Sequence, residues 1–110
     1  MSGCYELKKA KSGDIYFVLK ASNGQTILQS EMYKSRSSAE NGIASIRKNC
    51  PDDARYERSQ GTNGKFHFNL KAANHQVIGS SQMYKTERSR DAGIESVKKN
   101  GISEVIRGDI

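Results

Sequence analysis

The sequence predicts an α+β protein built of two tandem βββα repeats, which share one antiparallel sheet and pack two helices on one face of it about a pseudo-twofold axis. The first observation behind this prediction is an offset of 51 residues, which aligns 5–50 with 56–101 without a gap. The second is that each repeat contains three strand-like stretches and then one stretch of helical periodicity. The third is size, because each repeat is too small to bury a stable core alone and the two must share one.

Three strands are expected in each repeat. In the first repeat they are YELKK (5–9), IYFVLKA (15–21) and QTILQSE (25–31). Gly13 lies in the turn between the first two strands, and Asn23-Gly24 is a strong signal for a hairpin turn with positive φ. His75 takes the place of Gly24 in the second repeat, and we interpret it as a turn residue because histidine tolerates the left-handed conformation.

A helix is expected after the third strand of each repeat. Ser35 and Thr86 have the side chains of N-caps, and the two helices run from there to Asn49 and Asn100. The inward stripe is thin, with three residues spaced i, i+4 and i+7: Ala39, Ile43 and Ile46 in one helix, and Arg90, Ile94 and Val97 in the other. A basic pair ends each helix, where cations oppose the helix dipole favourably: Arg47-Lys48 and Lys98-Lys99.

Both helices contain an internal glycine, Gly42 in the first and Gly93 in the second. Glycine inside a helix costs about 1 kcal/mol relative to alanine. Its presence at equivalent positions therefore predicts a close approach of each helix to the sheet or to the other helix.

The residues that match between the repeats are mainly core, turn and cap residues. Strand alternation places identical triplets on the core side of the middle strands: Phe17, Leu19 and Ala21, and Phe68, Leu70 and Ala72. The opposite face, here called the open face, is predicted to carry pairs that differ: Tyr16 and His67, Val18 and Asn69, Thr26 and Val77, Leu28 and Gly79. The residues shared by the two repeats therefore indicate common packing more than a common binding site.

We expect a single domain over 1–110, with repeats at 5–50 and 56–101, a linker at 51–55 and a C-terminal tail at 102–110. This organisation predicts a monomer with an internal pseudo-dimer. The net charge is +6, and each repeat carries eight basic and four acidic residues, so the positive charge is spread and forms no block typical of nucleic-acid binders.

No stretch of the sequence is long and apolar enough to predict a membrane span or a secretory signal. Cys4 and Cys50 have no metal-ligand spacing, and we interpret them as two free thiols of a cytoplasmic protein.

Four strings carry a resemblance to a known family: YFVLKASNGQTILQSEMY, SAENGIASIRKN, GKFHFNLKAANHQVIGSSQMY and GIESVKKNG. On these residues the chain resembles the YegP-type small bacterial proteins of unknown function, in their tandem-repeat form, over all but its last several residues. The resemblance implies one continuous antiparallel sheet with helices packed against it, and helix exchange between the two units. It implies no activity, cofactor or catalytic residue.

The sequence favours a protein-interaction or structural module that acts through its sheet edges or its open face. The alternative is a weak module for single-stranded nucleic acid, in which bases stack on aromatic groups and phosphates meet cations. The candidate partner-binding residues for either function lie on the predicted open face: Lys20, Lys71, Tyr16 and His67.

An enzyme is not expected. Only His67 and His75 are available as imidazole bases, and neither lies in a nucleophile or metal motif. No glycine-rich phosphate-binding loop is present, because Gly13, Gly24, Gly61 and Gly64 are turn glycines. We therefore predict no catalytic residues, no metal and no cofactor.

Overall fold

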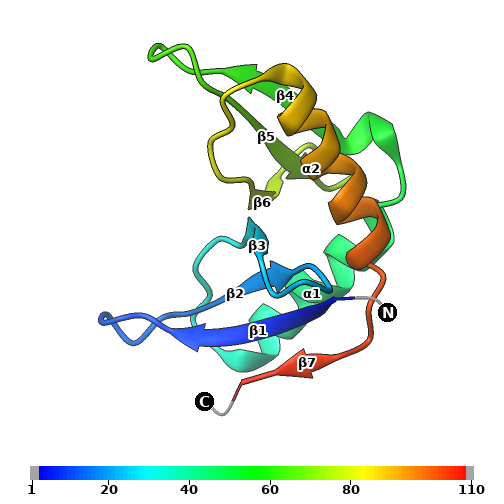
Figure 1. Cartoon of the computed structure of the whole chain (residues 1–110). Coiled ribbons are helices and arrows are strands. Elements are labelled where there is room, and N and C mark those ends of the chain that lie inside the picture. The colour runs from blue at the N-terminus through cyan, green and yellow to red at the C-terminus, as the bar shows by residue number, and fades with distance from the viewer. Residues whose placement is uncertain (1–2, 109–110) are drawn as a thin grey trace.

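The computed structural model describes residues 3–108, and each repeat has three strands followed by a helix (Figure 1). The first repeat contains β1 (Cys4–Lys9), β2 (Ile15–Lys20), β3 (Thr26–Gln29) and α1 (Arg36–Asn49). The second contains β4 (Tyr56–Gln60), β5 (Phe66–Lys71), β6 (Val77–Ser80) and α2 (Glu87–Asn100). A short 3-10 helix, η1 (Asp53–Arg55), lies in the linker, and a further strand, β7 (Ile106–Arg107), follows α2.

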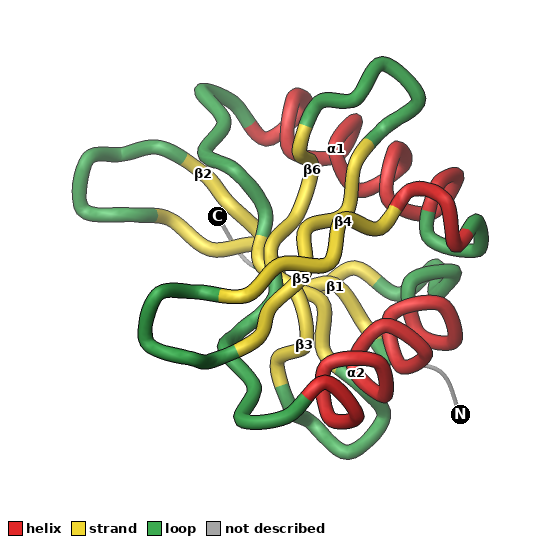
Figure 2. Tube along the Cα trace, turned by 90° about the horizontal axis from the view of Figure 1, so that it is seen from above, coloured by secondary structure: helices red, strands yellow, loops and turns green. Residues whose placement is uncertain are grey.

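All of these strands belong to one sheet, in the order β4-β5-β6-β3-β2-β1-β7. The two repeats meet where Gln29 of β3 pairs with Ser80 of β6 in antiparallel fashion. These two residues are equivalent in the repeat, so the pseudo-twofold axis passes between them. Both helices lie on the same side of the strands (Figure 2). The predicted α+β fold, with two repeats that share one sheet, is confirmed.

β7 is a strand that the sequence did not predict, because it forms within the expected tail and is only two residues long. It pairs with β1 in parallel, with Ile106 opposite Tyr5 and Arg107 opposite Glu6. The main-chain N–H of Tyr5 also donates to the oxygen of Val105 at 2.9 Å. The sheet is therefore mixed, and this segment covers the outer edge of β1.

The predicted caps and turns are confirmed. The Ser35 hydroxyl accepts a hydrogen bond from the N–H of Ser38 at 3.2 Å, and the Thr86 hydroxyl accepts one from Ser89 at 3.0 Å. His75 has a positive φ of 69°, as expected for a residue that replaces a turn glycine.

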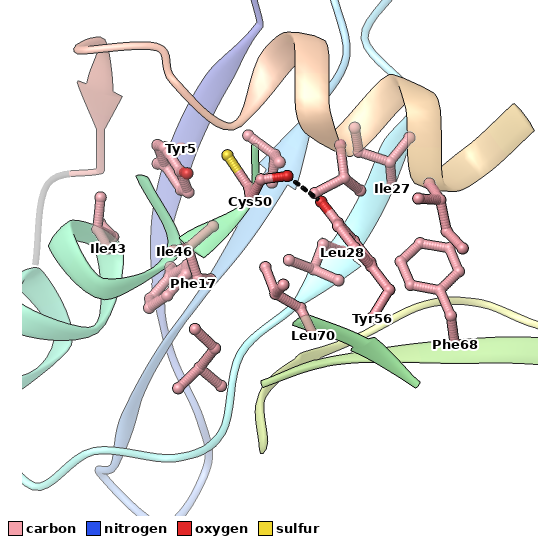
Figure 3. Close-up of a cluster of buried hydrophobic side chains, with 14 of the residues drawn as sticks. Tyr5, Phe17, Ile27, Leu28, Ile43, Ile46, Cys50, Tyr56, Phe68 and Leu70 are labelled. Carbon is pink, nitrogen blue, oxygen red and sulfur yellow. Dashed lines mark hydrogen bonds between the residues drawn. The ribbon is translucent and has the colours of Figure 1, made fainter. Parts of the chain in front are cut away.

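Each helix lies over both repeats. α1 contacts β2 of its own repeat and also β5 and β6 of the other, while α2 contacts β5 and also β2 and β3. The buried apolar side chains of the two repeats consequently form one cluster, part of which is drawn in Figure 3. Neither repeat has a core of its own.

The C-terminal ends of the helices are held by two equivalent tyrosines. The hydroxyl of Tyr56 donates to the main-chain oxygen of Cys50 at 2.7 Å (Figure 3), and that of Tyr5 donates to the oxygen of Gly101. Cys50 is fully buried, and burial raises the pKa of its thiol to about 11. Cys4 and Cys50 are both free thiols, as expected.

The helix glycines make room for tyrosine rings. A side-chain carbon on Gly42 would lie 2.7 Å from the ring carbon Cζ of Tyr33, and one on Gly93 would lie 2.8 Å from the same atom of Tyr84. The Tyr33 ring is in turn stacked on Phe17, with 6.0 Å between the ring centroids. The predicted close approach is therefore between helix and tyrosine, with the sheet beneath.

One predicted orientation is wrong. Leu28 and Gly79 lie on the core side of the sheet, opposite Leu19 and Leu70, and Leu28 is almost fully buried. The cause is a bulge, because the strand register shifts between Leu19 and Lys20 and again at the equivalent place in the second repeat. A bulge adds one residue to a strand and so reverses the alternation beyond it.

Candidate interaction surface

A row of five polar side chains and one valine crosses the middle of the open face. Strand register places six residues along it in the order Glu6, Val18, Gln29, Ser80, Asn69 and Glu57. The Ser80 hydroxyl donates to the side-chain oxygen of Asn69 at 2.9 Å, and the Asn69 amide donates to Glu57 at 3.3 Å. Three of the six residues are therefore bonded to one another, at the β4 end of the row.

The two candidate lysines each pair with a carboxylate at an end of this row. Lys20 Nζ lies 3.1 Å from the Glu6 carboxylate, and Lys71 Nζ lies 2.9 Å from that of Glu57. The hydrogen bond from each lysine is the main cause that lowers the pKa of its glutamate below the ordinary value. The positive charge of Lys20 and Lys71 is thus locally compensated.

Replacing Lys71 by methionine is expected to raise the pKa of Glu57 toward its ordinary value and to leave that of Glu6 unchanged. Because the folded pKa of Glu57 is depressed, the pair stabilises the protein above the unfolded pKa of the group, and this contribution is lost as the pH falls through the folded pKa. NMR titration of the side-chain carboxyl carbons measures both groups in one sample. A Glu57 titration that is the same in both proteins would contradict the pairing.

The four candidate residues do not gather into one patch. Tyr16 and Lys20 lie at opposite ends of β2, and His67 and Lys71 at opposite ends of β5. β3 and β6 separate these two strands, so the pairs are about 14 Å apart. Tyr16 and His67 are both partly buried, and His67 Nδ1 has no hydrogen-bond partner among residues 3–108.

The two equivalent outer strands, β1 and β4, differ in what lies beside them. β7 covers the outer edge of β1, whereas β4 is the last strand at the other end of the sheet and, among the described residues, pairs only with β5. Both strands contain the same Tyr-Glu pair, Tyr5-Glu6 in β1 and Tyr56-Glu57 in β4. The sheet therefore ends in one covered edge and one open edge.

The main chain of Arg58 points toward the open edge. Arg58 lies opposite Phe68, whose N–H and C=O both bond to Ser81 on the far side of β5. In an antiparallel pair, two opposite residues either bond each other or both point away. Since Phe68 points away, the N–H and C=O of Arg58 point outward from β4.

A cluster of charges lies beside β4 on the helix side. The Asp53 carboxylate is 3.1 Å from the guanidinium of Arg58 and 2.8 Å from Nζ of Lys98, and Arg58 also reaches Asp91 at 3.3 Å. The sequence reasoning missed these residues and Arg107. The available signal was the mismatch between the first strands, where Arg58 replaces Leu7 and Ser59 replaces Lys8.

Lys20 also lines a hollow of about 310 Å³ near the end of β2. Its other walls include Cys4, Glu6 and Arg107. Within the described part of the chain, no three His, Cys, Asp or Glu side chains are grouped so that they could hold a metal ion. No helix between residues 3 and 108 is long and apolar enough to cross a membrane.

Comparison with known proteins identifies the family. The family model described as "Domain of unknown function (DUF1508)" matches the chain twice, over residues 10–57 and 62–107. A UPF0339 protein of Acinetobacter baylyi is 63% identical over 107 residues, which are 97% of this chain and 96% of the relative. The UPF0339 protein YegP of Escherichia coli is 59% identical over 107 residues, which are 97% of each chain.

Two solved structures share the fold. The solution NMR structure of YegP from E. coli, described as a protein of unknown function, has a TM-score of 0.94 and 58% sequence identity, and the match covers 99% of this chain and 94% of that one. The solution NMR structure of a UPF0339 protein from Shewanella oneidensis has a TM-score of 0.92 and 52% identity, with 98% and 92% covered. Neither description states an activity.

Proposed function

We propose that this chain, which belongs to the DUF1508 family, is a non-enzymatic protein-interaction module. Its open edge at β4 accepts an extended strand of a partner protein. Strand addition of this kind takes its affinity from main-chain hydrogen bonds and its specificity from the side chains beside them. The binding surface is the outer edge of Tyr56–Gln60.

The contrast between two equivalent edges carries this proposal. The outer edge of β1 is already occupied by β7, whereas no described strand pairs with that of β4, where only the N–H of Tyr56 is bonded, to the main-chain oxygen of Asp53. The outward N–H and C=O of Arg58 are groups that a strand needs, and no hydrogen bond to either is made within residues 3–108. An unpaired edge of this kind is a template for another strand.

The local charges favour this edge over a nucleic-acid platform. Lys20 and Lys71, the best cations for phosphate contacts on the open face, are each paired with a glutamate. Tyr16 and His67, the candidate stacking groups, are partly buried and lie on strands separated by two others. A single strand of nucleic acid would have to separate these ion pairs before it gained phosphate contacts.

A partner other than a second copy fits the edge better. If β4 paired with β4 of another molecule about its centre, Arg58 would lie opposite Arg58. Moving the centre of the pairing one residue toward the start of the strand, which shifts the register by two residues, brings Glu57 opposite Glu57. Like charges that face each other directly across a sheet are destabilising.

We expect peptides selected from a random library against the folded protein to bind at β4. Binding should shift the amide resonances of Tyr56–Gln60 in the labelled protein. Arg58→Pro removes the outward N–H without removing a bond to β5, so it should weaken binding at least tenfold. Arg58→Ala is the matched control, because it removes the same side chain and keeps the N–H.

The same peptides methylated on alternate backbone nitrogens give a second measurement on the unaltered protein. Methylation at nitrogens that face β4 should abolish binding, and methylation at the others should not. The proposal is wrong if the selected peptides shift only residues outside β4, or if no peptide is selected. It is also wrong if single-stranded DNA binds instead with an affinity that depends on Lys20 and Lys71.

A further inference from the structure

We infer that the strand accepted at β4 runs parallel to it and presents a basic residue opposite Glu57. This inference rests on the proposed strand addition, and it assigns the direction of the partner and the chemistry of one of its side chains. It is argued from the way in which the chain completes its own equivalent edge.

β7 on β1 is the template for the missing strand. Arg107 of β7 lies opposite Glu6, and the two strands are parallel. β4 offers the same Tyr-Glu pair to an incoming strand, and the residues opposite Tyr56 in β5 and Tyr5 in β2 are both leucines. The N–H of Tyr56 already donates to the Asp53 oxygen, so an incoming strand would bond the C=O of Tyr56 and the N–H of Arg58 instead. An incoming parallel strand in the same register would place its residue equivalent to Arg107 opposite Glu57.

Glu57 has room for a further cation. Glu6 is surrounded by Lys20 at 3.1 Å and Lys8 at 3.7 Å, and its side chain is 29% exposed. Glu57 has Lys71 as its ion-pair partner, and its side chain is 47% exposed. Ser59 stands where the first repeat has Lys8, so the equivalent of this second cation is missing from the chain.

The helix side of the β4 edge also bears on which side chains the partner strand can place there. Opposite Tyr5, β7 supplies Ile106, which packs against the core. Beside Tyr56 the charges of Asp53, Arg58 and Lys98 occupy the helix side of the edge. An apolar side chain is therefore not required there, and the charged edge disfavours a wholly hydrophobic strand. The cation opposite Glu57 is the distinguishing feature of the partner.

The probe for this inference is a capped peptide with the sequence of residues 103–108, Ser-Glu-Val-Ile-Arg-Gly. It should shift the amides of β4, and replacing its arginine by glutamine should weaken binding at β4 about two- to fivefold, the range of a cross-strand charge pair. Glu57→Gln should abolish this preference. Glu6→Gln is the matched control, and it should leave the preference at β4 unchanged.

The direction of the bound peptide relative to β4 is measured with a spin label on the peptide N-terminus. A parallel strand should broaden the amides near Tyr56, and an antiparallel strand those near Gln60. The inference is overturned if the label broadens Gln60, if binding at β4 is insensitive to the peptide charge, or if this peptide causes no shift on β4 at millimolar concentration. None of these outcomes changes the expected binding of the library-selected peptides at β4. The proposed strand addition is therefore tested separately, by the library experiment.

Discussion

Replacing Gly79 by leucine is expected to destabilise the protein by about 3 kcal/mol, even though it makes the second repeat more like the first. Gly79 is the equivalent of Leu28, and both face the core near the pseudo-twofold axis. A side-chain carbon on Gly79 would lie 2.7 Å from a methyl carbon of Leu28 and 2.8 Å from its Cγ. The φ of Gly79 lies outside the left-handed region, so the cause is space alone.

The space that Leu28 fills is shared by the two repeats and holds one leucine. Leu28→Ala removes the three atoms that a side chain at Gly79 would meet, and on its own it should cost about 2–5 kcal/mol through the cavity that it leaves. The double variant Leu28→Ala/Gly79→Leu should recover part of both losses, because the leucine then enters from the other strand.

Urea denaturation of the wild type, the two single variants and the double variant measures the coupling. We expect a coupling free energy of at least about 2 kcal/mol, in the range found for residues that share one cavity. Ile78→Val is a suitable control beside the site, with an expected cost of about 1 kcal/mol and no coupling to Leu28→Ala. Additive effects of Leu28→Ala and Gly79→Leu would show that the two positions do not share a space.

Most of the fold could be predicted from the repeat, because equivalent residues in two copies must meet equivalent surroundings. Ser35 and Thr86 cap their helices, and Gly24 and His75 both take a positive φ. The bulge in β3, where Ile27 is the extra residue between Thr26 and Leu28, could not be predicted, because simple alternation gives no sign of an extra residue. That is why the orientation of Leu28 was wrong.

The candidate site was harder to predict, because it depends on what lies beside each strand. Lys20 and Lys71 were chosen for their positive charge, but each lies beside a glutamate, Glu6 or Glu57, that compensates this charge. The open edge at β4 becomes visible only once β7 is found on β1, and a two-residue strand has no periodicity to detect. Departures from the repeat, such as Arg58 for Leu7, were the better guide to the open edge that we propose as the binding surface.

A fragment of residues 1–50 alone is expected to be unfolded or to form a dimer, because the rest of the chain supplies much of what it packs against. α1 contacts β5 and β6, and α2 covers β2 and β3. β1 also depends on the C-terminal segment: the Gly3 N–H donates to Asn100 Oδ1 at 2.8 Å, and the Ser103 hydroxyl donates to the Gly3 oxygen at 2.6 Å. All of these contacts are lost in the fragment.

Mixing fragments 1–50 and 51–110 should restore the native fold, since the linker 51–55 contributes no residue to the buried core. Amide spectra of the labelled first fragment, recorded alone and with the second, measure folding, and sedimentation measures its mass. The matched control is the full chain cut within 51–55 after folding, which should keep the native spectrum. A monomeric fragment 1–50 with a well-dispersed spectrum would contradict the shared core. Three strands and one helix would then be stable without α2 above β3 and without β7 beside β1.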